Sequence, residues 1–256
     1  MSFLKVNLVK CLSDNYSYII FNPNSKKAII IDPAEEKPLT DVISKLNLDL
    51  KYILITHHHH DHVGGNLELK NKFNCKIVGF ANDSKRIPGI DITIKDKEIF
   101  NFEGEEIQLN FSPGHTSGHV FFYFKKNKFA FVGDVVFSLG CGRIFEGTVS
   151  DMYQSVLKVK LLPDEVKIFC GHEYTLSNLN FCLAYDENNQ HLKKRAAEIK
   201  NLRNKNLPTV PTTVLNEKQT NIFFRCDNKV ISSKLGLEGH PPEKVFKKLR
   251  ELKDNF

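Results

Sequence analysis

The sequence lacks three features that would each place it in a particular class of protein. No apolar run in its 256 residues is long enough to span a bilayer, and the N-terminus alternates like a strand where a signal peptide needs an apolar core. The six cysteines form no C-x-x-C pair, which indicates reduced, buried thiols and not a disulfide framework. We therefore expect a cytoplasmic protein with no membrane partner.

An excess of one charge is also missing from the first two thirds of the chain. Residues 1–172 hold 21 Lys and Arg against 20 Asp and Glu, whereas residues 173–256 hold 15 against 10. A basic C-terminal third suits a small anion, a nucleic acid or a membrane surface. Because the lysines lack the interleaved aromatic residues of a single-strand binder, we favour a small anion or a merely solvated surface, and no nucleic acid.

Short apolar segments bounded by turn residues predict strands in the first part of the chain and helices in the last. The expected strands are 3–9, 16–21, 27–31, 51–55, 76–80, 105–111, 120–124, 128–132 and 167–170. The expected helices are 38–46, 66–73, 151–161, 174–185, 188–204 and one that starts at Pro241-Pro242, while 81–97 stays unassigned. This order indicates a mainly β sandwich with helices outside over 1–172, followed by a helical domain over 173–256.

The segment 56–65, with sequence THHHHDHVGG, holds most of the candidate metal ligands. It lies between an apolar run and two glycines, so we expect a loop at the end of a buried strand. Imidazole and carboxylate groups both bind zinc, and His57 and His59 can hold one ion while Asp61 and His62 reach a second. A solvated histidine tract such as an expression tag would lie at a terminus. The pattern therefore favours a metal site, and it resembles the signature of the metallo-β-lactamase superfamily.

Three later clusters each add one candidate ligand beside an expected strand: His115, Asp134 and His172. Each alone is weak, because a lone loop histidine or strand-end aspartate is often structural. Together they complete two sites, in which the first ion has His57, His59 and His115, the second has Asp61, His62 and His172, and Asp134 bridges both. Nitrogen and oxygen donors suit zinc, although iron or manganese would also be accepted. Two ions roughly 3.5–4 Å apart can hold a bridging hydroxide, which is a hydrolytic nucleophile.

Four further residues complete the predictions for this site. Asp32 and His119 are expected to support ligands through hydrogen bonds or packing. His58 and His60 fall at the variable positions of the superfamily signature, so we do not expect them to bind metal.

The whole chain resembles the glyoxalase II family, the hydroxyacylglutathione hydrolases. The stretches that carry this resemblance are Asp14-Asn15-Tyr16, Thr56–Gly65, Pro113–His119, Gly133-Asp134, Gly140–Arg143, Glu146–Thr148, Gly171–Thr175 and Lys253-Asp254. The resemblance implies the α+β class, as an αββα metallo-β-lactamase-like sandwich followed by a small all-helical domain. It also implies two divalent metal ions and hydrolysis of S-D-lactoylglutathione and related 2-hydroxyacyl thioesters to D-lactate and glutathione, the second step of methylglyoxal detoxification.

The resemblance also implies a set of contacts to glutathione. By position these residues are Arg143, Phe145, His172, Tyr174, Arg250 and Lys253. Phe145 departs from the tyrosine that is common in the family, so we expect it to lower the affinity for glutathione. The retained basic residues and Tyr174 favour glutathione over trypanothione, and we expect a monomer.

The last helix is expected to bury one apolar stripe, formed by Val245, Phe246, Leu249, Leu252 and Phe256. Lys247, Arg250 and Lys253 are spaced three apart and should form a neighbouring basic ridge. A solvated charged face is the plainer interpretation, and we accept it for Lys247. For Arg250 and Lys253 the resemblance favours contact with the substrate, so we expect Arg250→Ala to raise KM and leave kcat nearly unchanged.

The chemistry of a thioester suits the expected site. A thiolate leaves with a pKa near ~8.5, so it needs little help from a general acid, while Asp61 could orient the hydroxide. Three alternatives remain: a persulfide dioxygenase of the same fold with one iron, a nuclease with strong salt dependence, and a zinc-stabilised binding module with closed four-ligand sites. The presence of His59, Asp61, His62 and His172 favours two metals over one.

Overall fold

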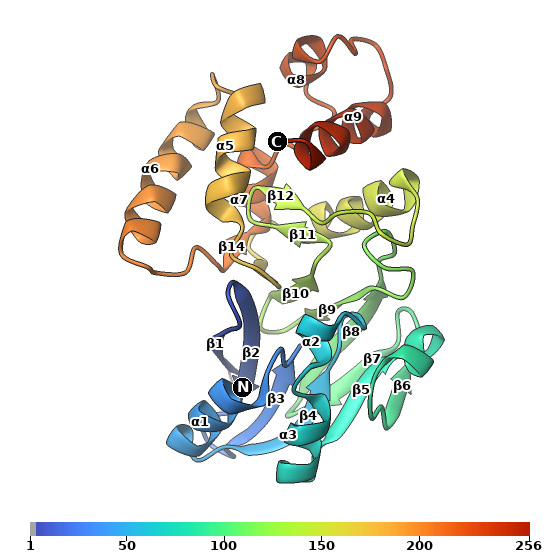
Figure 1. Cartoon of the computed structure of the whole chain (residues 1–256), viewed down its shortest axis with the longest axis vertical. Helices are drawn as coiled ribbons and strands as arrows, with labels where there is room; N and C mark the ends of the chain where they lie inside the picture. The colour runs from blue at the N-terminus through green and yellow to red at the C-terminus, as the bar shows by residue number, and fades with distance from the viewer. Residues whose placement is uncertain (1–3) are drawn as a thin grey trace. The chain divides into compact units, whose positions relative to one another are not determined.

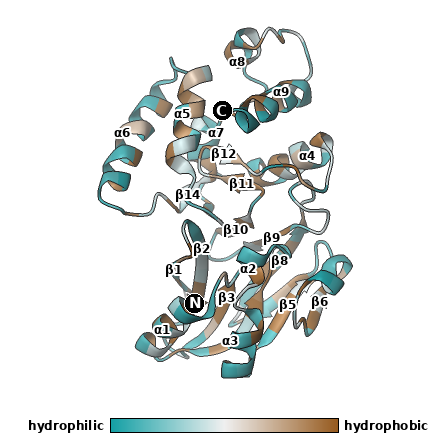
Figure 2. Ribbon diagram, in the orientation of Figure 1, coloured by the Kyte–Doolittle hydropathy of each residue, from teal (hydrophilic) through white to brown (hydrophobic). Residues whose placement is uncertain are grey.

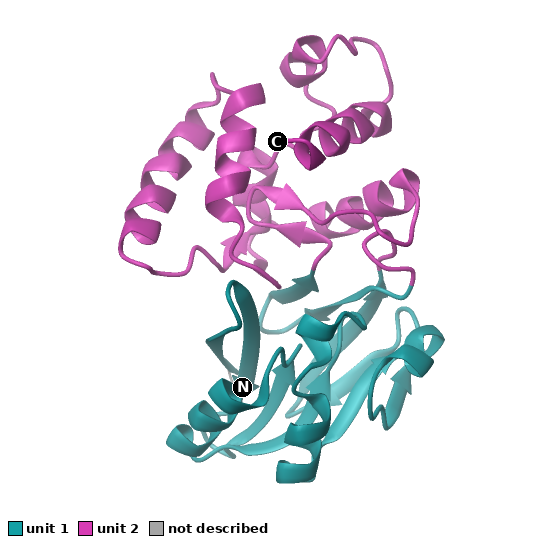
Figure 3. Ribbon diagram, in the orientation of Figure 1, with its two compact units in different colours: residues 1–111, 118–133 teal, residues 112–117, 134–256 magenta. Residues whose placement is uncertain are grey.

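The computed structural model describes residues 4–256 and divides into two compact units (Figures 1 and 3). Unit 1 comprises residues 1–111 and 118–133, and unit 2 comprises residues 112–117 and 134–256. The expected strand at 3–9 starts outside the described residues, and the strand observed there is Lys5–Cys11. Among the described residues, every helix is too short or too polar to cross a membrane.

Unit 1 contains a six-stranded mixed sheet that is antiparallel at one edge and parallel elsewhere. In order across the sheet, its strands are β1 (Lys5–Cys11), β2 (Asn15–Phe21), β3 (Lys27–Ile31), β4 (Asp49–Leu54), β5 (Lys76–Phe80) and β6 (Ile92–Ile94). All residues of β2 and the last four of β3 are buried. A strand covered on both faces requires continuous apolar sequence. The brown colour of β3 and β5 in Figure 2 marks such hydrophobic sequence.

Helices cover one face of this sheet. They are α1 (Glu36–Leu46), α2 (His60–Val63), α3 (Asn66–Phe73) and the 3-10 helix η1 (Ala81–Arg86). Helix α1 buries Leu39 and Ile43, four residues apart, and ends at Asn47 in the left-handed conformation (φ 50°). Leu69 of α3 joins the same apolar core, which also holds Ile53 of β4. This core fixes the carboxyl ends of β3 and β4.

A four-stranded antiparallel meander in unit 1 covers the other face. Its strands are β7 (Ile99–Phe102), β8 (Glu105–Phe111), β9 (Val120–Phe124) and β10 (Phe129–Gly133). Aromatic pairs with ring centroids 4.9–5.3 Å apart join the two sheets: Tyr18–Phe131, Tyr52–Phe100 and Phe80–Phe111. Rings from three strands of each sheet therefore hold the sandwich together face to face.

Unit 2 is mostly helical. It has the hairpin β11 (Val136–Phe137) and β12 (Gly140–Cys141), the antiparallel pair β13 (Lys167–Cys170) and β14 (Thr212–Thr213), and the helices α4 (Val149–Lys160), α5 (Thr175–Tyr185), α6 (Gln190–Asn204), α7 (Val214–Thr220), α8 (Lys229–Lys234) and α9 (Pro242–Asp254). In α9, Val245, Phe246 and Leu249 are fully buried, as predicted. Phe246 packs on Tyr153 of α4. Phe256 lies beyond the helix end and is 62% exposed, although its ring meets Phe181 of α5 edge-on at 5.3 Å.

Most expected elements are observed within two or three residues of their predicted bounds, and the six cysteines are buried as predicted. Burial raises the pKa of Cys170 and Cys182 to about 12, which keeps both thiols protonated. The unassigned segment 81–97 contains η1 and β6. The missed elements are β6, β7, β11, β12, β14, α2, α7, α8 and η1, all seven residues or shorter. Such segments are too short for a hydrophobic period to show.

Helix α4 begins with a capping box. Thr148 Oγ1 accepts from the Asp151 amide at 3.1 Å, and Asp151 Oδ2 accepts from the Thr148 amide at 2.8 Å. Hydrogen bonds from the Thr148 side chain and amide lower the pKa of Asp151. We predict that Asp151→Asn costs about 1 kcal/mol of unfolding free energy at neutral pH. Because the folded pKa is depressed, the difference should disappear as pH falls through that folded value.

Urea unfolding of both proteins at a series of pH values checks this. Ser150→Ala, an exposed change in the same helical turn, is the control and should stay within about 0.5 kcal/mol of the parent. An Asp151→Asn difference that is constant from neutral to acidic pH would rule out the ionised cap.

Candidate metal centre

Unit 1 supplies four of the expected ligands just beyond β4. His57 is fully buried, and His59 directly precedes α2. The prediction of a continuous loop was wrong for residues 60–63, because the His62 amide bonds the His59 carbonyl at 2.9 Å and starts a helical turn. Asp61 and His62 therefore belong to α2.

A buried carboxylate orients two of these histidines. Asp32 follows β3 with φ 48°; its Oδ1 accepts from the Thr56 amide at 2.8 Å and its Oδ2 from Thr56 Oγ1 at 2.6 Å. The same Oδ2 lies 3.0 Å from His62 Nδ1, and Thr56 Oγ1 lies 3.0 Å from His57 Nδ1. Because Thr56 gives its proton to Asp32, His57 Nδ1 must be the donor to Thr56. Both histidines thus carry their proton on Nδ1 and present Nε2 as a lone pair, as metal-binding histidines do.

The hydrogen bonding expected of Asp32 to a candidate ligand is therefore observed. Asp32, His57 and His62 offer atoms within 4.8 Å of one another, yet the carboxylate already accepts three hydrogen bonds from Thr56 and His62. These hydrogen bonds favour a role for Asp32 in orienting the two histidines over direct binding of an ion.

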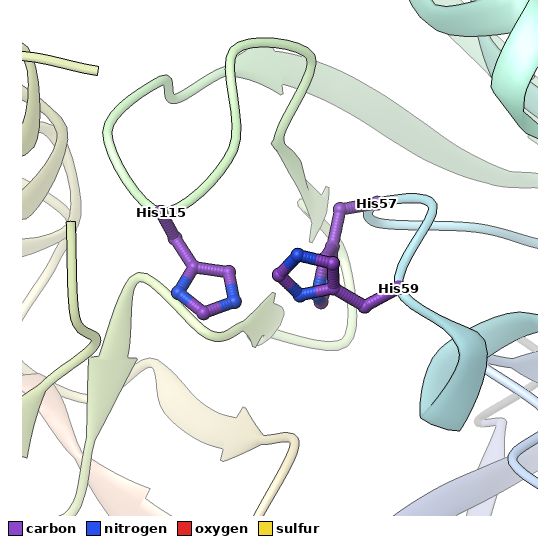
Figure 4. Close-up of side chains that lie close together, drawn as sticks. All are labelled: His57, His59 and His115. Atoms are coloured by element: carbon purple, nitrogen blue, oxygen red, sulfur yellow. The ribbon is translucent and has the colours of Figure 1, made fainter. Parts of the chain in front are cut away.

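His57 and His59 face each other, with His57 Nε2 3.1 Å from His59 Nδ1. Figure 4 shows the two rings beside each other and also labels His115, which belongs to unit 2. Nitrogens this close can share one ion. His119 stacks on His57 with ring centroids 4.8 Å apart, which gives it the supporting role expected. A Cβ at Gly133 would lie 2.7 Å from His119 Nε2, so only glycine lets that ring sit there.

Asp61 is held by a residue to which the sequence analysis gave no role. Asn15, buried at the start of β2, donates through Nδ2 to Asp61 Oδ2 at 3.0 Å and to the Asp61 carbonyl at 3.1 Å. His62 Nε2 lies 3.7 Å from the same Oδ2. Asn15 thus aims the carboxylate toward the lone pair of His62. The available signal was its place in the Asp14-Asn15-Tyr16 stretch, which by pattern alone suggests only a turn.

Unit 2 brings together the other three expected ligands, all buried. One oxygen, Asp134 Oδ2, lies 3.5 Å from His115 Nε2 and 3.3 Å from His172 Nε2. His115 Nδ1 lies 2.9 Å from the Arg143 carbonyl, which can only accept, so the His115 proton is on Nδ1 and its Nε2 lone pair faces Asp134. His172 follows β13 by two residues.

These donors suit divalent metal ions. Five imidazoles and two carboxylates form the two groups. In three of the imidazoles Nδ1 donates a hydrogen bond, which leaves the Nε2 lone pair available to an ion. Thiolates do not contribute, since burial raises the pKa of Cys141 to about 11 and that of Cys170 to about 12. Nitrogen and oxygen donors are accepted by zinc, iron and manganese alike.

The expected aromatic contacts to glutathione flank the unit 2 ligands. The Tyr174 ring lies parallel to His172, with centroids 4.8 Å apart and an interplanar angle of 4°. Phe145 meets His115 edge-on at 5.1 Å and is 59% exposed. Both rings therefore offer apolar surface next to ligands.

The expected basic contacts differ from one another in exposure. Arg143 is 67% exposed, with Nε 3.8 Å from Asp254 Oδ1. Lys253 is half-buried and donates to Ser177 Oγ at 3.0 Å; burial and then the charges of Arg250 and Arg143 lower its pKa. Arg250 is only 6% exposed, so it does not share an exposed ridge with Lys247, and that expectation was wrong. Its contact with substrate stays a prediction.

Comparison with known proteins assigns both parts of the chain. Residues 12–172 match the model of the metallo-beta-lactamase superfamily, and residues 173–256 match that of the hydroxyacylglutathione hydrolase C-terminus. A hydroxyacylglutathione hydrolase of Pelagibacter ubique is 46% identical over 99% of this chain and 100% of its own. One of Rhizobium etli is 41% identical over the whole of both chains. The chain belongs to the hydroxyacylglutathione hydrolase family.

Solved structures agree with this assignment at the level of fold. ETHE1 from Myxococcus xanthus superimposes with a TM-score of 0.68 at 21% identity, covering 98% of this chain and 91% of its own. The BLEG-1 B3 metallo-beta-lactamase gives 0.66 at 20% identity, covering 86% and 99%. The predicted α+β class, a metallo-β-lactamase fold followed by a helical C-terminal part, is confirmed for this member of the hydroxyacylglutathione hydrolase family.

We predict that Asp32→Ala lowers metal affinity about 10- to 100-fold, because His57 and His62 lose the carboxylate that fixes their tautomers. Asp32→Asn should also weaken binding, since an amide NH2 would meet the Nδ1 proton of His62. Competition with a chelator measures the affinity, and circular dichroism reports folding. Asp41→Ala removes an exposed aspartate in α1 and should bind metal as the parent does. Equal affinity in Asp32→Ala would refute the role given to Asp32.

Proposed function

We propose that this chain hydrolyses the thioester of S-D-lactoylglutathione and related 2-hydroxyacylglutathiones to the hydroxy acid and glutathione. The observation that carries this is the match of residues 173–256 to the hydroxyacylglutathione hydrolase C-terminus, because the metal-binding part alone is common to the whole superfamily. Relatives similar over the full length carry the same name, which favours a thioester hydrolase over the persulfide dioxygenase.

The seven ligand-type residues would hold two ions. We assign His57, His59 and His115 to the first, and Asp61, His62 and His172 to the second, with Asp134 shared. Three nearby groups support this: Asp32 for His57 and His62, Asn15 for Asp61, and the Arg143 carbonyl for His115. Bound divalent ions lower the pKa of coordinated water towards neutrality and polarise a carbonyl. Zinc is our choice among zinc, iron and manganese.

The protein side chains bind and orient the substrate. Arg143 and Lys253 suit the carboxylates of glutathione, and the rings of Tyr174 and Phe145 suit its apolar stem. Phe145 has no hydroxyl, so it contributes packing without a hydrogen bond. A glutathione thiolate leaves with a pKa near that of a free thiol, about 8.5, so no proton donor is required on the leaving side.

Several finer assignments stay predictions. They are the division of roles between residues 1–172 and 173–256, the cytoplasmic location and the monomeric state.

We predict that the purified protein carries close to two metal ions per chain and hydrolyses S-D-lactoylglutathione. Chelation should abolish turnover and zinc should restore it, because the nucleophile depends on the ions. Metal analysis, thioester absorbance and oxygen uptake on a persulfide test this together. A protein with one iron that consumes oxygen and leaves the thioester intact would establish the dioxygenase instead.

A pair of variants tests the ligand assignment in the same assay. Asp134→Ala should lower metal content at both sites and abolish turnover. His60→Ala is the matched control, since His60 is exposed on α2 and is not assigned to either ion. If both variants were equally impaired, the register of the histidine segment would be wrong.

We predict that Lys253→Ala raises KM for S-D-lactoylglutathione about ten- to a hundredfold with kcat nearly unchanged. A charge-assisted hydrogen bond contributes roughly 1.5–3 kcal/mol, and a contact remote from the thioester serves ground and transition states alike. High salt should raise KM of the parent more than that of the variant. Lys247→Ala, an exposed lysine on the same helix, is the control. A fall in kcat at constant KM would contradict the assignment.

A further inference from the structure

The β11–β12 hairpin is held by side chains from two C-terminal helices, α5 and α7, and the contacts go to its main chain. They are Asn178 Nδ2 to the Ser138 carbonyl at 3.1 Å, the Leu139 amide to Glu217 Oε2 at 2.8 Å, and Asn221 Nδ2 to the Gly140 carbonyl at 3.0 Å. All six residues that form these three hydrogen bonds are buried. The position of the hairpin is therefore set by the helices that follow it.

Arg250 of α9 adds a further side-chain contact to the main chain, at the end of β12. Its Nη1 donates to the Cys141 carbonyl at 2.8 Å and lies 3.4 Å from the Gly142 carbonyl. Its Nη2 donates to Asp254 Oδ1 at 2.9 Å, and the guanidinium lies 5.4 Å from the centre of the Phe223 ring. The side chain is 7% exposed. A buried guanidinium committed to main-chain carbonyls fixes the path of the backbone there.

The backbone that Arg250 fixes encloses His115. The Arg143 carbonyl lies 2.9 Å from His115 Nδ1, and the Phe145 amide bonds the His115 carbonyl at 3.3 Å. A Cβ at Gly142 would lie 1.9 Å from the Asp134 carbonyl and 3.2 Å from His115 Nδ1. Residues 142–145 thus hold both the ring and the main chain of His115.

We propose that Arg250 is a positioning residue for His115, acting through the carbonyls of Cys141 and Gly142 and the segment that follows them. Its function is to keep the Arg143 carbonyl where it fixes the His115 tautomer. The proposal rests on the proposed function only for the identity of His115 as a metal ligand. It adds a second role to the contact with glutathione that the family resemblance implies for Arg250, because Nη1 and Nη2 also bind groups of the protein itself.

The test compares Arg250→Met, Arg250→Lys and the matched control Lys247→Met in full-length, zinc-loaded protein. Arg250→Met and Lys247→Met each remove one positive charge from α9, but Lys247 is exposed. NMR of protein with 15N-labelled histidine measures solvent exchange of the His115 Nδ1 proton, and a chromogenic chelator measures zinc release. Neither measurement uses substrate, so both remain informative if the thioester is not the true substrate.

We expect Arg250→Met to speed both exchange of that proton and loss of one zinc ion about tenfold. Loss of a group that supports a metal ligand typically lowers metal affinity about 10- to 100-fold, and Arg250 acts through further residues, so we expect the smaller effect. Arg250→Lys keeps a donor for the Cys141 carbonyl and should recover most of the loss. Lys247→Met should match the parent. If Arg250→Met does not fold, Arg250→Lys alone tests the proposal. We then expect the His115 Nδ1 proton of Arg250→Lys to exchange faster than in the parent and more slowly than in an unprotected imidazole.

Turnover separates the two roles of Arg250. A positioning residue should lower kcat equally for S-D-lactoylglutathione and for a thioester of a small uncharged thiol. Parent-like proton exchange and zinc release, with a raised KM for the glutathione thioester alone, would overturn the proposal and assign Arg250 to direct contact with substrate.

Discussion

The buried carboxylate of Asp32 is the group on which the metal-binding part of unit 1 depends. Such a charge is unfavourable in an apolar interior unless donors surround it, and Thr56 and His62 provide three. They can do so only because β3 and β4 run parallel in register, with Ile31 opposite Leu54, so that both strands end beside each other. The pairing of two strands therefore determines which nitrogen of His57 and of His62 carries the proton and which keeps its lone pair.

The elements and ligands that were predictable are those with a local signal. Strands such as 27–31 and 76–80 were predicted with correct bounds because continuous apolar sequence marks a strand buried on both faces. The histidine motif was recognisable because its candidate ligands lie within six residues of one another. The helical turn of α2 was not, since four residues show no period.

The supporting contacts were beyond a sequence pattern because they join distant segments. Asn15 reaches Asp61 across 46 residues, and Arg250 reaches Cys141 across 109. A helical period correctly placed Arg250 and Lys253 near the apolar stripe, but it could not show that one side chain turns inward and the other stays half-exposed. Burial of a long cationic side chain depends on which carbonyls happen to face it.

The helices α5, α7 and α9 bind the β11–β12 hairpin through its carbonyls and an amide, groups that every amino acid carries. Mutation can therefore alter the hairpin side chains without removing these bonds, whereas Asn178, Glu217 and Arg250 cannot change without losing one. We therefore expect the hairpin side chains to vary more in evolution than the helical residues that bind the hairpin main chain. Gly140 is the exception, because a Cβ there would lie 2.4 Å from Asn178 Nδ2. At its other positions, relatives could diversify the sequence of the hairpin while inheriting its shape from a distant part of the same gene.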